Sequence, residues 1–354
     1  MKILLLSSAY NGMTQRVHVE LLQRGHTVSI ELAINEHTML EGVQLFQPDI
    51  IICPFLRHRV PESIWRHYTC IIVHPGIKGD RGASSLDWAI QNKETEWGVT
   101  ALQAAEEMDA GDIWATATFK MRPGTKSGIY TVEVIEAGVK VVLQTLERFQ
   151  DASFKPEPLD YSKPDVRGQL RPTMPQTERK IDWQADSTET ILDKINAADG
   201  CPGVLDTIFG ADYYLYGAHK EGSLYGKPGE LVAKRFGAVC RATVDGAIWI
   251  SHLKPKAAHG DKQTFKLPAV RVLGDKASTL PELPLSIYHS PGNTFREIWY
   301  EERKSVGYLH FEFHNGAMNT VQCLRLRDAV MEVRNRPTKI LVLIDNCPGL
   351  FCQF

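Results

Sequence analysis

The sequence predicts an α/β protein whose first domain is a doubly wound parallel sheet, followed by a smaller β domain and a third α/β segment. Two observations carry this prediction. Over residues 1–150, short apolar runs alternate with helical patterns, as in parallel sheets that helices cover on both faces. Further along, short apolar runs broken by glycines follow at regular spacing, which is typical of small β-barrels and sandwiches. A chain of 354 residues has room for two or three domains.

The first domain is predicted to hold apolar strands separated by helices. The first helix, Gln15–Arg24, is closed by Gly25, and a long helix over Ile129–Phe149 completes the domain. The predicted strands are Lys2–Leu6, His26–Leu32, Asp49–Pro54, Cys70–His74, Gly98–Gln103 and Asp112–Thr118.

Residues 150–177 are rich in proline and polar side chains, which predicts a linker that crosses the surface. The expected second domain contains a helix near Ser187–Ala198 and the apolar runs Asp212–Leu215, Gly229–Phe236, Ala238–Val244 and Ala247–His252. In the third segment we expect a strand, a helix and a strand at Ser305–Phe313, Thr320–Arg334 and Lys339–Ile344.

Composition limits the partners and the compartment. A formal net charge of −2 argues against a general nucleic-acid or anionic-membrane binder. The opening apolar run is too short for a signal-peptide core or a membrane span. Seven cysteines, an odd number without CxxC pairs, disfavour a disulfide framework or a zinc site and fit a reducing cytoplasm; Cys347 and Cys352 are interpreted as structural or accidental. We predict no metal site.

The stretch HPGIKGDRGASSLDWAI places His74 at the end of a buried strand, where doubly wound sheets keep their ligands. A lone histidine at such a position is more often a hydrogen-bonded structural residue, but its surroundings favour a site. The glycines give a loop that a ligand can approach closely, and the loop carries both signs of charge. Ser84 or Ser85 can cap the following helix. The predicted binding residues in this stretch are Gly76, Asp80, Arg81, Gly82 and Ser84.

A second motif, MDAGDIW, places Asp109 and Gly111 in a turn between two strands. An Asp-x-Gly tripeptide by itself usually marks only a turn. Its occurrence about 35 residues after a histidine, a glycine-rich loop and a helix is far less common.

Three basic or polar positions are further candidates. Gln15 and Arg16 lie near the first strand-to-helix turn, where this fold presents groups to phosphates, although a solvated pair at the start of a helix is as good an interpretation. Arg16, Arg81 and Lys126 are candidates for contacts with phosphates or with the glutamate of a folate.

The motifs HPGIKGDRGASSLDWAI and GVTALQAAEEMDAGDIW resemble the folate-dependent formyltransferases, a family that includes methionyl-tRNA formyltransferase. The resemblance continues into KIDW and NAADGCPG, which are similar to the start of that family's carboxyl-terminal barrel domain, so that it covers residues 1 to about 255. It implies 10-formyltetrahydrofolate as co-substrate. No GxGxxG follows the first strand, so a dinucleotide enzyme is a poor alternative.

A closer resemblance, carried by LSSAYNG, the histidine stretch and VGYLHFEFHNGAMNT, is to the HypX (HoxX) family of hydrogenase maturation proteins. It implies a formyltransferase fused to an enoyl-CoA hydratase-like (crotonase-like) domain, which makes the carbon monoxide ligand of NiFe hydrogenase through formyl-CoA. The domains expected from it are 1–160 (Rossmann-like formyltransferase), 161–260 (OB-like β-barrel) and 261–354 (crotonase-like). The last is expected to be truncated, without the carbon monoxide-releasing activity, because the closing DNCPGLFCQF does not match a glycine-rich oxyanion segment.

The resemblance also assigns roles. Family catalysis uses an Asn-x-His pair and the Asp of an Asp-x-Gly turn, which implies His74 and Asp109 as the catalytic residues. His74 would stabilise an oxyanion or shuttle a proton, and Asp109 would hold the imidazole. The Asn position holds Ile72, which donates no hydrogen bond; this favours a CoA thiol as acceptor.

The prediction is thus a cytoplasmic enzyme that transfers a formyl group from 10-formyltetrahydrofolate to CoA, with hydrogenase maturation proteins as possible partners in the cell. Two alternatives stay open. One is methionyl-tRNA formylation, against which Ile72 and the lack of surplus basic charge speak. The other is a catalytically idle chain that binds folate or CoA.

Overall fold

The computed structural model describes residues 1–257, 263–289 and 292–347, and these form two compact units. Unit 1 comprises Met1–Pro123 and Ile129–Met174, and unit 2 comprises Gly124–Gly128 and the described residues from Pro175 onward. No helix in these ranges is long and apolar enough to cross a membrane. The six cysteines that they contain are free. Cys352 lies outside the described residues.

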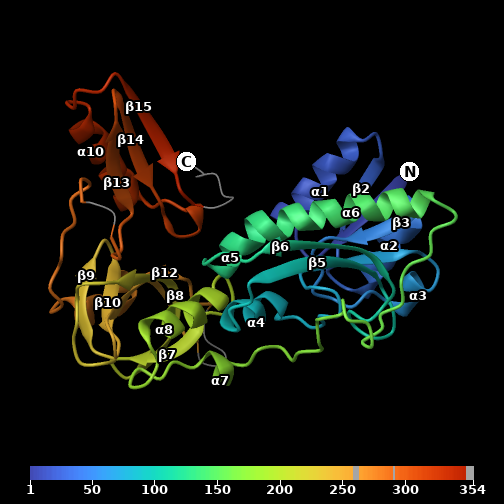
Figure 1. Ribbon diagram of the computed structural model, residues 1–354, viewed down its shortest axis with the longest axis horizontal. Coiled ribbons are helices and arrows are strands. Elements are labelled where there is room, and N and C mark those ends of the chain that lie inside the picture. Colours follow the sequence, from blue (N-terminus) through green and yellow to red (C-terminus); the bar gives the residue numbers. More distant parts are fainter. Residues whose placement is uncertain (258–262, 290–291, 348–354) are drawn as a thin grey trace. The chain divides into compact units, whose positions relative to one another are not determined.

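Unit 1 is built on one six-stranded sheet of order β2-β1-β3-β4-β5-β6 (Figure 1). Its strands are β1 (Lys2–Ser7), β2 (Thr27–Leu32), β3 (Ile50–Cys53), β4 (Cys70–His74), β5 (Glu96–Gln103) and β6 (Ile113–Lys120). Its helices are α1 (Gly12–Gln23), α2 (Glu36–Phe46), α3 (Glu62–Trp65), α4 (Ser85–Gln91) and α6 (Ile135–Gln150). A π-helical turn, Tyr130–Val134, connects α6 to α5 (Lys126–Ile129).

The sheet is mixed, which corrects the prediction of a parallel sheet. Strands β1 to β4 are parallel, whereas β5 runs antiparallel to both β4 and β6. The chain after β4 enters β5 from the edge at which β4 ends, so that Thr100 is the register partner of His74.

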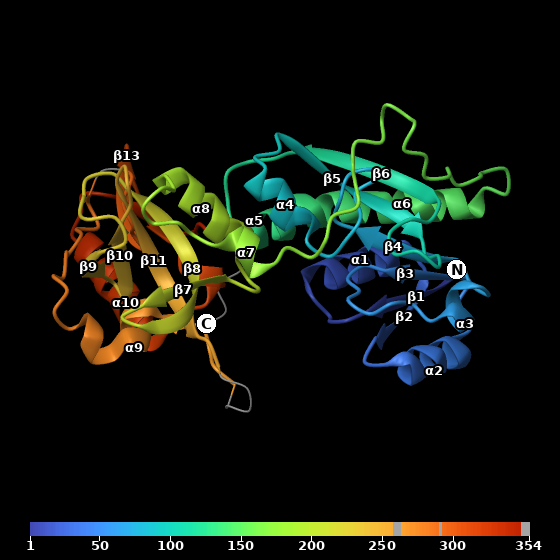
Figure 2. The same ribbon diagram turned by 90° about the horizontal axis from the view of Figure 1, so that it is seen from below.

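Helices cover both faces of the sheet, as the doubly wound prediction requires (Figure 2). On one face, α1 packs against α6, and the missing side chain of Gly138 admits Met13. On the other face, α2 and α3 pack on a cluster that contains Met39, Val43 and Ile64. The strands between them are apolar on both sides because each side is buried.

Unit 2 contains a second six-stranded sheet, of path β7-β8-β11-β10-β9 with β12 beside β11. The strands are β7 (Val204–Ile208), β8 (Ala211–Glu221), β9 (Leu231–Arg235), β10 (Ala238–Ala242), β11 (Ala247–Pro255) and β12 (Leu267–Pro268). The helices are α7 (Gln176–Arg179), α8 (Thr188–Ala197), α9 (Ala269–Leu273) and the 3-10 turn Gly274–Ala277. Successive side chains of β11 point to opposite faces of the sheet and so enter two different cores. Ile248 and Ile250 pack with α8 and α9, while Trp249 packs with Phe295.

A third sheet, of order β13-β14-β15, also belongs to unit 2. It consists of β13 (Ile298–Arg303), β14 (Val306–Phe311) and β15 (Ile340–Asp345), with a 3-10 turn at His314–Gly316. Helix α10 (Thr320–Val333) connects the parallel pair β14 and β15 and packs on the sheet through Leu326, Ala329 and Val333. The three elements predicted here are confirmed, and β13 is an additional strand.

The proline-rich segment after α6 is fastened to unit 1. Arg81 and Leu170 form a parallel β-bridge. Trp88 donates a hydrogen bond to the carbonyl of Pro172 (3.0 Å). The expected surface linker is therefore attached to the first unit as far as Met174.

Candidate functional site

The candidate site begins where β4 ends, and the loop that follows is held from behind by β5. The loop turns tightly, because the amide of Asp80 donates to the carbonyl of Ile77 (2.8 Å). Trp97 on β5 donates its indole N–H to the carbonyl of Pro75 (3.0 Å), and Thr100 donates its hydroxyl to the carbonyl of Gly76 (2.9 Å). Each bond satisfies a loop carbonyl that has no partner in the sheet.

His74 is buried between two carboxylates. Its Nε2 donates a hydrogen bond to Oδ2 of Asp80 at 2.9 Å. On the other side of the ring, Nδ1 lies 3.6 Å from Oδ2 of Asp109. The first distance is a good hydrogen bond and the second is too long for one. Asp80 thus fixes the ring and its tautomer, and leaves Nδ1 as the nitrogen that is not committed to a protein group.

Gly76 allows the close approach of His74 and Asp80. A Cβ placed on Gly76 would overlap both Nε2 of His74 and Oδ2 of Asp80. The backbone of Gly76 is not in the left-handed region, so conformation does not require a glycine here. Space does, because no side chain fits between these two groups.

The pKa of His74 is raised above its ordinary value of 6.5. Burial is the largest influence and acts to lower this pKa, because a charged imidazolium loses its hydration. The hydrogen bond with Asp80, followed by the charges of Asp109 and Asp80, acts in the opposite direction and outweighs burial. An imidazole in this setting takes up a proton readily.

The loop between β5 and β6 folds back so that Asp109 reaches His74. Asp109 has a left-handed backbone (φ 53°), which Asp tolerates better than most residues, and its Oδ2 accepts a hydrogen bond from the amide of Gly82 (3.1 Å). Arg81 donates from Nε to the carbonyl of Met108 (2.9 Å) and so ties the two loops together. A Cβ on Gly111 would overlap the carbonyl of Gln103, so this glycine closes the turn.

Ile72 precedes His74 by two residues and points to the same face of β4. Its partly buried side chain packs against the apolar cluster beneath α2 and α3. An aliphatic side chain is held here by the core, and it adds no hydrogen-bond donor beside the imidazole.

The structure brings His74, Gly76, Asp80, Arg81, Gly82 and Asp109 together in two facing loops. Ser84 adjoins them, but it does not cap α4 through its side chain. Its hydroxyl oxygen accepts from the amide of Met174 (3.0 Å). Ser85 donates to the carbonyl of Pro75 (2.8 Å) instead.

The remaining predicted residues are engaged elsewhere. Gln15 donates its side-chain amide to the carbonyl of Tyr10 (2.9 Å). Arg16 pairs with Glu20 and Glu136, each at 3.0 Å, so its charge is already balanced. Lys126 belongs to unit 2, where it donates to the carbonyl of Cys201 (2.7 Å).

Sequence reasoning treated Asp80 as a binding residue and missed it as the closest partner of the imidazole. The signal was present in the spacing: six residues after a strand-terminal histidine, with glycines at 76 and 79, a tight turn returns an aspartate toward the strand end.

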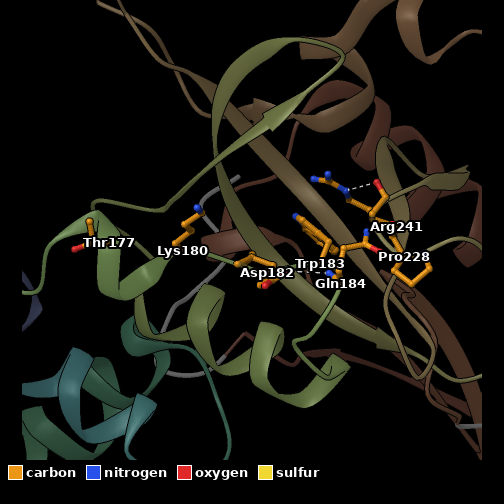
Figure 3. A pocket seen from close by; sticks show the side chains of 9 residues that line it. Thr177, Lys180, Asp182, Trp183, Gln184, Pro228 and Arg241 are labelled. Carbon is orange, nitrogen blue, oxygen red and sulfur yellow. Dashed lines mark hydrogen bonds between the residues drawn. The ribbon is translucent and has the colours of Figure 1, made fainter.

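Unit 2 has an open cavity of about 680 Å³, lined by Thr177, Lys180, Ile181, Asp182, Trp183, Gln184, Pro228, Gly229 and Arg241 (Figure 3). Its polar groups are largely used within the fold. Gln184 donates to the carbonyl of Pro228 (2.9 Å), and the guanidinium of Arg241 stacks on Trp183 while it bonds to the carbonyl of Gly229 (2.7 Å). We therefore interpret the KIDW motif, residues 180–183 in the wall of this cavity, as structural.

Two family matches cover much of the chain. Residues 31–146 match the family described as formyl transferase, and residues 173–265 match the formyl transferase C-terminal domain. Within these matches lie β4, the glycine-rich loop, the Asp109 turn and most of the second sheet.

Individual relatives agree with this result. The chain is 44% identical over 343 residues to the hydrogenase maturation factor HoxX of Bradyrhizobium diazoefficiens, covering 97% of this chain and 58% of HoxX. The crystal structure of HypX from Aquifex aeolicus in complex with tetrahydrofolic acid matches with a TM-score of 0.92 and 43% identity, over 98% of this chain and 60% of that one. Methionyl-tRNA formyltransferase of Bacillus licheniformis is 24% identical over 244 residues, covering 68% of this chain and 76% of that protein. The chain thus spans about three fifths of the length of HoxX and HypX.

Proposed function

Because the chain belongs to the formyl transferase family, we propose that it transfers the formyl group of 10-formyltetrahydrofolate to the thiol of coenzyme A. The observation that carries the proposal is the buried imidazole of His74 at the end of β4, bonded to Asp80 on one side and facing Asp109 on the other. A histidine with only a structural role would stay neutral and would need no second carboxylate beside its ring, whereas His74 has one in Asp109.

The folate half of the proposal is supported by HypX of Aquifex aeolicus, which was crystallised with tetrahydrofolic acid and is 43% identical to this chain. The carboxyl ends of β1, β3 and β4 meet at one edge of the parallel part of the sheet, where this fold class places ligands. We place the folate's formyl group at this edge, within reach of Nδ1 of His74.

In the proposed reaction, the thiolate sulfur bonds to the formyl carbon and the carbonyl oxygen becomes an oxyanion. The bond between that carbon and N10 of the folate then breaks, and N10 takes up a proton. His74 carries a proton on Nδ1 when it is charged, which it donates as a hydrogen bond to the oxyanion and passes to N10. The thiol loses its proton to solvent before the attack, and His74 takes up a proton from solvent after it protonates N10, so that the protons balance and His74 is restored.

The two carboxylates have different roles in this scheme. Asp80 holds the Nε2 proton and therefore the orientation of the ring. Asp109, which is held by the amide of Gly82, stabilises the imidazolium through its charge. The site adds no amide donor at Ile72. This suits a thiol acceptor, because a thiolate is nucleophilic near neutral pH without strong help from a base.

The similarity to HoxX extends the proposal to the cell. We propose that formyl-CoA made by this chain serves the synthesis of the carbon monoxide ligand of NiFe hydrogenase, and that hydrogenase maturation proteins are its partners. The free cysteines of the described ranges are consistent with a reducing cytoplasm as the proposed compartment.

The acceptor is tested by mass spectrometry. The purified chain is incubated with 10-formyltetrahydrofolate and with either CoA or methionyl-tRNA. We expect a mass gain of one formyl group on CoA and none on the tRNA. Formylation of the tRNA alone would show that the acceptor is an amine and not the proposed thiol. Binding of folate without formylation of either acceptor would indicate an idle binding protein.

A further inference from the structure

The cover segment, residues 161–171, lies against the outer side of the glycine-rich loop and is bonded to its backbone. The amide of Gly168 donates to the carbonyl of Lys78 (2.9 Å), and the hydroxyl of Tyr161 donates to the carbonyl of Gly79 (3.0 Å). Both bonds hold the chain immediately before Asp80.

The chain after Asp80 is held in the same way. The amide of Arg81 donates to the carbonyl of Gln169 (3.2 Å), and its carbonyl accepts from the amide of Arg171 (3.1 Å). A Cβ on Gly82 would overlap that same Arg171 at its carbonyl oxygen. The cover segment therefore fixes the loop on both sides of Asp80.

Gly168 touches Asp80 directly. A Cβ on Gly168 would overlap the backbone nitrogen of Asp80 and the carbonyl carbon of Gly79. These are backbone atoms that cannot rotate away as a flexible side chain can. Gly76 lies against the carboxylate, so that one glycine contacts the backbone of Asp80 and another its side chain.

The carboxylate of Asp80 depends on this backbone support. Its Oδ2 bonds to His74, whereas Oδ1 is buried without a hydrogen-bond partner among the described residues. No second side chain there orients the carboxylate, and its position follows from that of the loop backbone.

We propose that Gly168 is a positioning residue of the formyl-transfer site: its close contact with the backbone of Asp80 sets the hydrogen bond between Asp80 and His74. The inference rests on the proposed function and adds a residue outside the two catalytic loops. It also explains why a proline-rich segment beyond α6 is fastened to the amino-terminal unit.

The test compares Gly168→Ala with Leu170→Ala in the full chain. Leu170 is in the same segment with an exposed side chain, so its truncation should leave the loop in place. The readout is the NMR titration of His74 without substrate, assigned with His74→Gln because the chain has 12 histidines. The charged groups that face the imidazole are Asp80 and Asp109.

In Gly168→Ala we expect the titration of His74 to move to lower pH, because burial is then opposed by Asp109 without the hydrogen bond of Asp80. Leu170→Ala should titrate like the parent chain. With CoA as acceptor, kcat/KM of Gly168→Ala should fall about 10²-fold, the scale of a misplacement of about 1 Å.

An unchanged His74 titration in folded Gly168→Ala, or an equal shift in Leu170→Ala, would overturn the proposal. If Gly168→Ala does not fold, Tyr161→Phe carries the test, since it removes only the bond to Gly79. A shift to lower pH there supports the proposal, and an unchanged titration refutes it. Absence of formyl transfer in the parent chain would refute the proposed function while the titration still decides this inference.

Discussion

His74 faces two carboxylates at different distances, 2.9 Å from Asp80 and 3.6 Å from Asp109. Asp80 contributes both a hydrogen bond and a charge to the stabilisation of the imidazolium, whereas Asp109 contributes a charge. The ring is thus anchored through one nitrogen and available to substrate through the other.

Replacing each carboxylate by its amide should separate the two roles. Asp80→Asn should lower kcat/KM by about 10²-fold or more and move the His74 limb of the pH–rate profile to lower pH, because the imidazolium loses its hydrogen-bonded partner. Asp109→Asn should move that limb by less. A larger displacement in Asp109→Asn than in Asp80→Asn would reverse the assignment.

The raised pKa of His74 also predicts a pH-dependent stability. The folded chain binds the imidazole proton more tightly than the unfolded chain, so the contribution is fully present below about pH 6.5 and is lost as the pH rises through the folded pKa. The free energy of unfolding of the parent chain should therefore fall over this interval relative to His74→Gln. Parallel pH profiles in denaturant titrations of the two proteins would contradict the raised pKa.

For the individual site residues, the sequence predicted which of them lie close together but not which hydrogen bonds they form. His74 and Asp109 were expected to meet, and they lie in facing loops. Spacing alone signalled the bond between His74 and Asp80. That Ser84 does not cap α4 could not be predicted, because its hydroxyl oxygen accepts from the amide of Met174, some 90 residues further along the chain.

Among the elements, β5 determines the shape of the loop that follows β4. Thr100 and Trp97 bind two successive loop carbonyls from behind, those of Gly76 and Pro75. These contacts exist because β5 is antiparallel to β4 and extends beyond its end, with Thr100 as the register partner of His74.

Thr100→Val should lower the free energy of unfolding by about 1–3 kcal/mol, because it leaves the buried carbonyl of Gly76 unpaired while it preserves side-chain volume. Thr116→Val on β6 is the matched control, since Thr116 is exposed and should change stability by no more than about 0.5 kcal/mol. Urea denaturation measures both. Equal, small effects would show that the bond to Gly76 contributes little.

Helix and strand positions were predicted well where periodicity was strong, as in β4, β14 and α10. The direction of β5 was not, because an apolar run reads the same in a parallel or an antiparallel strand. Strands β7 and β13 were missed because acidic residues interrupt them: VLDTI contains Asp206, and IWYEER ends in three charges.

For the whole molecule, the division into two units should be visible in cysteine reactivity. Cys53 and Cys70 are buried in unit 1 and Cys240 in unit 2, and burial raises the pKa of Cys70 and of Cys240 to about 12. Cys201 and Cys323 are exposed.

In pulsed alkylation across a denaturant series, Cys201 and Cys323 should react in the native chain. Cys53 and Cys70 should become reactive together, when unit 1 unfolds, and Cys240 should follow the unfolding of unit 2. Mass spectrometry of the peptides gives each midpoint. Separate midpoints for Cys53 and Cys70 would show that unit 1 is not one cooperative body.

The central claim is that His74 carries formyl transfer to CoA, and its most direct test is the release of tetrahydrofolate from 10-formyltetrahydrofolate, with and without CoA, by the parent chain and by His74→Gln. We predict release that requires CoA and falls by about 10²- to 10⁴-fold in the variant, the range typical of a lost general acid–base group. Circular dichroism checks that both proteins are folded. Release that is unchanged in His74→Gln, or no release by the folded parent chain under either condition, would contradict the claim.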